Sequence, residues 1–139
     1  MGEVRVQMEL ANAGDEYAAA NGWLGAESVR RQVVDVVADT GAVMMMIPED
    51  LVNALGLRFV RKVLVTYADE RKATANVAGP LTVKVGDRSA IIEVIVGPPT
   101  GDPLLGQIPL EAMDLHVDCA KRQLVPRPIS PYLPLLAMK

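Results

Sequence analysis

The sequence predicts a mainly β domain with one or two short helices, and two observations lead to this fold class. Apolar and polar residues alternate along several segments, most clearly over residues 4–10, whose even positions are all apolar. A period of two places successive side chains on opposite faces of a strand. Glycine and proline cluster between these segments, above all in residues 97–103, and neither a helix nor a central strand accepts that composition.

The same reasoning divides the chain into elements. A proline and two acidic residues suit the first turn of a helix over residues 48–55, which Gly56 is placed to end. A second short helix is expected near residues 109–113, and residues 12–25 form an excursion or a short helix whose Trp23 covers the core. Further strands are expected at residues 30–38, 43–47, 58–67, 72–85, 91–96, 115–119 and 123–125.

The chain has the length of one domain, at 139 residues. We expect a single domain over residues 1–126, in which residues 1–31 form an N-terminal strand and excursion and residues 32–126 form the core. Prolines at positions 126, 128, 131 and 134 predict an irregular tail over residues 127–139.

Composition excludes several classes of function. A net charge of −3 without a basic cluster argues against a nucleic-acid partner, and no apolar run reaches the length of a membrane span. The start of the chain lacks the pattern of a signal peptide, so we expect a cytoplasmic protein without membrane contact. Half of the residues are apolar, which predicts surface that is buried against a partner.

Scarce cysteine and histidine narrow the chemistry further. Cys119 is the only cysteine, which excludes an internal disulfide and a thiolate-rich metal site, and we expect a small buried side chain. His116 is the only histidine and lies in an expected strand with no nucleophile turn nearby, so we expect a solvated or hydrogen-bonded ring. Neither a metal nor a cofactor is expected.

One carboxylate lies where a core tolerates it poorly. The mostly apolar residues 33–38 (Val-Val-Asp-Val-Val-Ala) run directly into Asp39, Thr40 and Gly41, a tripeptide that occurs once. A buried strand accepts aspartate only when something compensates its charge, and glycine permits a tight turn. Residues 104–106, Leu-Leu-Gly, form a weak echo, since both segments are followed by Ile-Pro and an expected helix.

Taken in order, these pieces resemble the retropepsin-like aspartic proteases, the retroviral-protease type and its small bacterial relatives. The resemblance covers roughly residues 32–126 and rests on an ordered set of motifs. The motifs lie at residues 37–42 (Val-Ala-Asp-Thr-Gly-Ala), 47–51, 55–57, 67–69, 103–106, 115–118 and 124–126. The resemblance implies a closed, mostly antiparallel acid-protease barrel, a homodimer, and hydrolysis of peptide bonds by water.

The chemistry gives a separate reason for a homodimer. Aspartic-protease catalysis uses two carboxyl groups about 3 Å apart that share one proton, because both cannot ionise at that distance. One activates water as a base while the other donates to the scissile carbonyl. Each chain holds one Asp-Thr-Gly, so Asp39 would pair with Asp39 of a second chain across a two-fold axis. The expected partners are a second copy and a peptide or protein substrate.

The resemblance also assigns roles to other residues. Thr40 would link the two loops through its hydroxyl, Gly41 would contact the substrate backbone, and Ala42 would allow close approach. Leu105 and Gly106 would back the catalytic loop. The flap that covers an extended peptide would comprise Tyr67, Ala68, Asp69, Glu70 and Arg71.

Three features depart from the viral pattern. Residues 43–46, Val-Met-Met-Met, stand where viral enzymes carry acids, and we expect them to fill the core. Gln107 stands where those enzymes carry an arginine, and the flap tip has no glycine. Asp35 lies four residues before Asp39 and on the same face of the strand. We favour a solvent-facing role for Asp35 over a role as a second acid of the site.

Two alternatives stay open. The chain could be a catalytically idle dimer of the same fold that binds peptides or serves as an interaction module, which the glycine-free flap favours. It could also be a generic small β-barrel in which Asp39 caps a turn. The intact tripeptide favours an enzyme, since a module released from catalysis has no need of a costly carboxylate pair.

Overall fold

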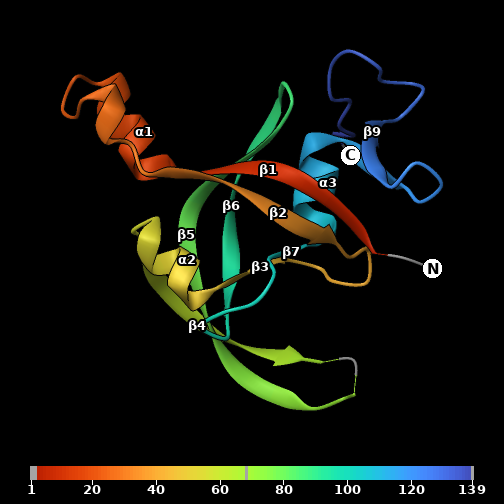
Figure 1. The fold of residues 1–139 in the computed structure, drawn as a ribbon, viewed down its shortest axis with the longest axis horizontal. Helices are drawn as coiled ribbons and strands as arrows, with labels where there is room; N and C mark the ends of the chain where they lie inside the picture. Colours follow the sequence, from red (N-terminus) through yellow and green to blue (C-terminus); the bar gives the residue numbers. More distant parts are fainter. Residues whose placement is uncertain (1–2, 68, 139) are drawn as a thin grey trace.

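A computed structural model describes residues 3–67 and 69–138 of this chain, and Figure 1 shows the fold. The strands are β1 (Val4–Asn12), β2 (Arg31–Ala38), β3 (Met45–Pro48), β4 (Arg58–Thr66), β5 (Lys72–Val85), β6 (Arg88–Gly97), β7 (Leu104–Leu105), β8 (Leu115–Asp118) and β9 (Gln123–Pro126). The helices are α1 (Ala13–Ala20), α2 (Glu49–Ala54) and α3 (Gln107–Met113), with a 3-10 turn at Ala26–Ser28. The mainly β class that the alternating pattern predicted is confirmed.

Seven of the described strands form a sheet that closes into a ring. Their order is β1-β2-β7-β3-β6-β5-β4, and β1 also pairs with β5, so β4 lies outside the ring on β5. The ring agrees with the expected closed, mostly antiparallel barrel, although two of its strand pairs are parallel. β7 runs parallel to β2, and β3 runs parallel to β6.

The two parallel pairs have a topological cause. The chain between β2 and β7, like the chain between β3 and β6, passes through α2 and the β4–β5 hairpin. A two-residue turn forces antiparallel pairing, whereas a long crossover allows parallel pairing. Side chains alternate with the same period in both arrangements, so the sequence pattern did not distinguish them.

The described chain holds three short α-helices, one more than the one or two named for the fold class. The third is α1, which lies where residues 12–25 were expected to form an excursion or a short helix; it begins at Asn12, where the side-chain Oδ1 accepts from the N–H of Asp15 at 2.9 Å. The end of α2 is as expected, because Gly56 follows it with a φ of 65°. None of the helices in the described residues is long and apolar enough to cross a membrane.

Trp23 was expected to cover the core and Cys119 to be buried, but both side chains lie at the surface. Trp23 is 71% exposed and meets the ring of Tyr17 edge-on, with the ring centroids 5.8 Å apart. Cys119 is exposed in the turn between β8 and β9. Both expectations are wrong, because α1 and the β8–β9 hairpin stand out from the ring at opposite ends of the molecule (Figure 1). His116 is exposed, as expected.

Aliphatic side chains fill the interior of the ring. Of residues 43–46, which were expected to fill the core, only Met45 is fully buried; Met44 and Met46 are half-buried, and Val43 is 66% exposed, so the expectation is wrong for Val43. Met45 and Ile47 of β3 are both fully buried. They belong to one cluster with Val36, Leu81 and Leu105, which come from three further strands. The strand that leads to Asp39 is therefore anchored from inside the ring.

The hairpin of β4 and β5 is confirmed and projects from the ring (Figure 1). The two strands pair from Arg58 with Gly79 to Thr66 with Lys72, with one irregularity near Phe59. Beyond the ring, β4 pairs only with β5 among the described strands, so the outer part of the hairpin is supported by its own cross-strand contacts.

Beyond β9 the chain returns to the end of α3. Residues 127–138 contain no helix or strand, as expected for the tail. Asp114, which ends α3 with a φ of 55°, is 6% exposed, and its carboxylate accepts from the hydroxyl of Ser130, the N–H of Leu135 and the guanidinium of Arg127. These hydrogen bonds, that of Ser130 foremost, hold the pKa of Asp114 well below the usual aspartate range.

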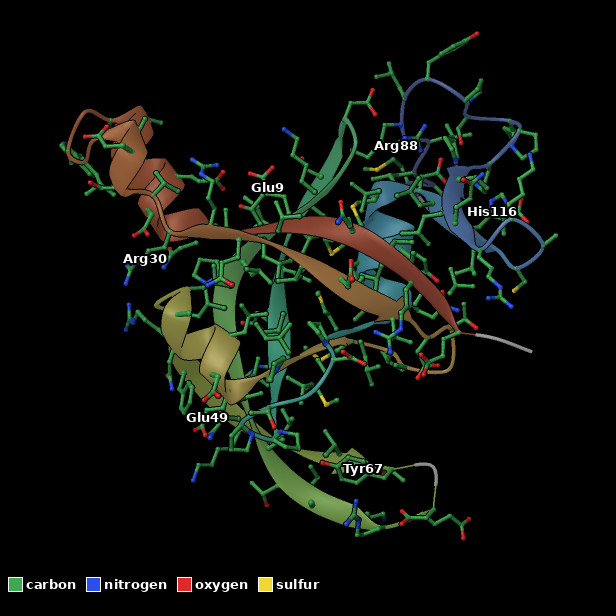
Figure 2. The ribbon with its side chains drawn as sticks, viewed as in Figure 1. Glu9, Arg30, Glu49, Tyr67, Arg88 and His116 are labelled. Atoms are coloured by element: carbon green, nitrogen blue, oxygen red, sulfur yellow. The ribbon has the colours of Figure 1, made fainter. Side chains whose placement is uncertain are left out.

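Arg88 of β6 also contributes to the junction between the end of α3 and the tail (Figure 2). Its side chain is buried and donates to the carbonyl oxygens of Met113 (3.2 Å), Asp114 (2.8 Å) and Ser130 (2.6 Å). The last carbonyls of a helix lack partners within the helix, so the guanidinium satisfies them and opposes the negative end of the helix dipole.

Candidate active site

Asp39 opens the loop that follows β2. Its N–H donates to the carbonyl oxygen of Leu105 (2.9 Å), and its carbonyl oxygen accepts from the N–H of Ala42 (3.1 Å). The side chain is exposed, and its Oδ1 accepts from the N–H of Gly41 at 3.0 Å. A carboxylate can accept several hydrogen bonds, so this arrangement leaves Asp39 with acceptor capacity to spare.

The loop rests on the segment that joins β7 to α3. β7 runs beside β2 and pairs Leu105 with Ala38. Gly106 follows, and a Cβ at that position would lie 2.5 Å from the carbonyl oxygen of Met44 and 2.7 Å from that of Ala42. Only glycine allows the two backbones to approach so closely. The two segments that formed the weak echo in the sequence therefore lie against each other.

Further main-chain hydrogen bonds join the loop to the start of α3. The N–H of Gln107 donates to the carbonyl oxygen of Ala42, and that of Ile108 donates to the carbonyl oxygen of Val43, both at 2.8 Å. The side-chain Nε2 of Gln107 donates to the carbonyl oxygen of Thr40 at 3.0 Å. Sequence reasoning noted Gln107 only as a departure from the viral pattern and did not place it in the site.

The residues beside Asp39 have the exposure that contact with another molecule requires. Thr40 and Gly41 are exposed, and Ala42 is half-buried. The roles assigned to these residues toward a second chain and a substrate backbone stay predictions.

The expected flap lies at the tip of the β4–β5 hairpin. The N–H of Tyr67 donates to the carbonyl oxygen of Arg71 (2.8 Å), and the N–H of Arg71 donates to Oδ1 of Asp69 (3.0 Å). The guanidinium of Arg71 lies 4.6 Å from the centre of the Tyr67 ring, a cation–π contact. Glu70 has a φ of 66°, and Ala68 lies outside the described residues.

The hairpin and the Asp39 loop are not joined by any interaction found among the described residues. In Figure 1 the tip of the hairpin and the end of β2 lie on the same side of the view, and Figure 2 labels Tyr67 near that tip. The structure thus joins residues 39–42 to Leu105 and Gln107 by hydrogen bonds and holds Tyr67 and residues 69–71 in a separate turn.

A hollow of about 650 Å³ lies next to the loop. Asp39 and Thr40 line it together with apolar side chains from β1, α3 and β8, among them Val4, Leu110 and Leu115. A second hollow of about 370 Å³ lies beside α2 and contains none of the predicted site residues. The apolar wall beside Asp39 is suited to apolar side chains of another molecule.

The site of one chain offers few titratable partners to Asp39. Asp35 is exposed on β2 opposite Gln7, which agrees with the solvent-facing interpretation. The described residues contain no cluster of three or more side chains that could hold a metal ion. A single carboxylate acts as a base or as an acid at one moment, but not as both.

Comparison with known protein families gives one match. The family model described as aspartyl protease matches residues 21–107, a span that runs from the end of α1 through the Asp39 loop and the hairpin to Gln107. No curated protein matches the chain.

Proposed function

Because this chain belongs to the retropepsin-like aspartyl protease family, we propose that it is an aspartic endopeptidase that hydrolyses peptide bonds. The observation that carries the proposal is the exposed carboxylate of Asp39, held on a loop whose main chain is fastened to Leu105 and to the start of α3. A reacting group needs a fixed position together with free acceptor capacity, and Asp39 combines the two.

We propose further that the active site forms across a homodimer. The two Asp39 carboxyl groups would share one proton, and the ionised one would take a proton from water while the protonated one donates to the scissile carbonyl. The water oxygen then adds to the carbonyl carbon, and the tetrahedral adduct releases the amine as it gains a proton. The single Asp-Thr-Gly of each chain supports this arrangement.

The substrate would lie extended between the Asp39 loop and the hairpin tip. A strand-like peptide can pair its main chain with such a hairpin, and closure of the tip would exclude water. Thr40 would link the two loops near the axis, and Gly41 would face the substrate backbone. The apolar wall beside Asp39 supports a preference for apolar side chains near the scissile bond.

Asp39→Asn tests the catalytic assignment. We expect peptide cleavage to fall roughly a thousandfold or more, because the amide can neither accept nor supply the shared proton. Asp35→Asn is the matched control, since it removes an exposed carboxylate from the same part of the chain. Equal rates for Asp39→Asn and the parent protein would refute an aspartic mechanism.

Mixing the parent with Asp39→Asn tests whether the site is shared. With equal amounts and random exchange, about half of the parent chains end in mixed pairs, so activity per parent chain falls to about half if both carboxyls are needed. Mixing with Asp35→Asn should leave it unchanged. A parent protein that cleaves peptides as a monomer at micromolar concentration would exclude the shared pair.

The pH dependence offers a third check. A pair that must hold one proton is active over a limited range, so we expect a bell-shaped profile with an acidic optimum. Activity that still rises through about pH 9 contradicts the mechanism.

A catalytically idle peptide-binding dimer is the second candidate, and the hairpin tip favours it. Glu70 takes the left-handed conformation that glycine adopts at least cost, which restrains the tip where a mobile flap is needed. Peptide binding without cleavage, unchanged by Asp39→Asn, would support this candidate and exclude the enzyme.

A further inference from the structure

The amide side chain of Gln107 holds the backbone of the loop that carries Asp39. Its Nε2 donates to the carbonyl oxygen of Thr40 at 3.0 Å, and its main-chain N–H donates to that of Ala42 at 2.8 Å. The base of the Gln107 side chain is itself fixed, since Gly106 packs against the carbonyls of Met44 and Ala42 with no room for a Cβ. Gln107 thus reaches the loop from a rigid support.

The hydrogen bond to Thr40 acts on one peptide unit with two functional ends. The carbonyl of Thr40 and the N–H of Gly41 belong to the same planar group, and in a trans peptide they point in opposite directions. The carbonyl end accepts from Gln107, while the N–H end donates to Oδ1 of Asp39 at 3.0 Å. Fixing the first end therefore fixes the second.

This peptide unit has a second orientation within reach. Glycine populates positive and negative φ with similar ease, so the Thr40–Gly41 peptide can rotate at low steric cost. Rotation by half a turn would withdraw the N–H from Asp39 and bring the carbonyl oxygen of Thr40 toward the carboxylate. Both groups are acceptors, so the carboxylate would lose its donor and turn away.

We propose that Gln107 is a positioning residue that holds the Thr40–Gly41 peptide in the orientation that donates to the Asp39 carboxylate. The hydrogen bonds run in series from Gln107 Nε2 to the Thr40 carbonyl and from the Gly41 N–H to Asp39, and bonds in series polarise one another. The consequence for catalysis rests on the proposed function, whereas the effect on the peptide orientation does not.

Two substitutions separate this role from simple packing. Gln107→Met keeps the length of the side chain and removes the donor to the Thr40 carbonyl, so kcat should fall roughly tenfold or more. Gln107→Glu keeps the shape and places an acceptor against the Thr40 carbonyl, so its kcat should be lower still.

Which of the two variants has the lower kcat decides between a positioning role and a packing role for Gln107. If Gln107 only filled space, the isosteric glutamate would be harmless and methionine the more damaging change. Glutamate also suits the first turn of α3, so the Tm of the Gln107→Glu variant should not fall below that of the parent. Gln32→Met and Gln32→Glu are matched controls at the start of β2, beside the second hollow, and should keep the parent kcat.

The amide signal of Gly41 gives a readout that needs no substrate. In ¹H–¹⁵N spectra of the full chain, the Gly41 resonance should move upfield in both Gln107 variants and stay in place in both Gln32 variants, because a lost hydrogen bond to a carboxylate shields the proton. A Gly41 signal that stays in place in Gln107→Glu, or an unchanged kcat in an active enzyme, would overturn the inference.

The two proposals fail in different ways. A shifted Gly41 signal in a protein that never cleaves peptides would leave the positioning role intact and refute the proposed function. An active parent enzyme whose kcat is indifferent to both Gln107 variants would leave the proposed function intact and refute the positioning role.

Discussion

Asp39 after β2 and Asp114 after α3 are both aspartates at the end of a regular element, yet their surroundings differ in almost every respect. Asp39 is exposed and receives a hydrogen bond from the N–H of Gly41 in its own loop. Asp114 is buried and receives hydrogen bonds from Ser130, Leu135 and Arg127, which reach it from the tail. The Asp39 carboxylate accepts one of these hydrogen bonds, whereas the Asp114 carboxylate accepts three.

The difference is the one expected between a candidate catalytic acid and a structural one. Proton transfer requires a carboxyl whose two protonation states are both accessible, and donors that saturate the ionised form remove that freedom. The lowered pKa of Asp114 is the sign of such saturation. Helix α3 joins the two sites, because it starts at Gln107 against the Asp39 loop and ends at Asp114.

The largest expected contrast is in activity. Asp39→Asn should abolish cleavage, roughly a thousandfold or more, and leave the Tm within about 2 °C of the parent. Asp114→Asn, assayed below its Tm, should keep cleavage within about threefold, because Asp114 lies at the far end of α3. A strong loss of kcat in folded Asp114→Asn would show that the two sites are not independent.

Arg88→Met should give the largest change in stability. The substitution keeps an unbranched side chain in a buried position but leaves the carbonyls of Met113, Asp114 and Ser130 without their donor. We expect the Tm in thermal unfolding to fall by roughly 10 °C. Arg61→Met is the control, since its ion pair with Glu93 is exposed and contributes little. Similar Tm losses for both variants would show that burial of Arg88 does not matter.

Asp114→Asn should lower the Tm by a smaller amount, roughly 5 °C near neutral pH. Asparagine accepts the left-handed backbone at this position, so the variant tests the charge and the acceptors and not the turn. The pKa of Asp114 is lowered in the folded protein, so its contribution to stability is present above the unfolded pKa and is lost as the pH falls.

The Tm difference between the parent and Asp114→Asn should therefore shrink from about pH 5 to about pH 2. Thermal unfolding followed by circular dichroism across that range measures it. A difference that stays constant or grows toward low pH would mean that the ionised carboxylate is not what stabilises the junction.

Glu70→Asn should give the smallest effect of these substitutions. It changes the tip of the β4–β5 hairpin, which is the expected flap. Asparagine tolerates the positive φ at this position better than glutamate, so the Tm should rise by about 1–2 °C. Thr66→Asn is the control at a β4 position with ordinary strand geometry, where the Tm should not rise. A decrease in Tm for Glu70→Asn would show that the glutamate side chain supports the tip.

Local features of the fold could be predicted because they depend on neighbours in sequence. The strand into Asp39, the helix that Gly56 ends and the β4–β5 hairpin each follow from a short pattern of apolar, turn and capping residues. The position of Asp39 at the end of a strand belongs to this group, and it was enough to single out the candidate site.

Other features could not be predicted, because their partners are distant in sequence. The parallel pairing of β2 with β7 depends on how the chain crosses the ring, and alternation does not encode direction. The exposure of Trp23 and Cys119 depends on α1 and the β8–β9 hairpin standing away from the core. Only the folded chain brings Gln107 to the carbonyl of Thr40.

The sequence by itself determined that one aspartate follows an apolar strand and precedes a glycine turn, since both are properties of adjacent residues. Only the tertiary structure decided that Asp114 would be saturated by Ser130 and Leu135 while Asp39 stayed open. The physical reason is that acceptor capacity is consumed by whichever donors folding brings within hydrogen-bond distance, and for Asp114 those donors lie in the tail.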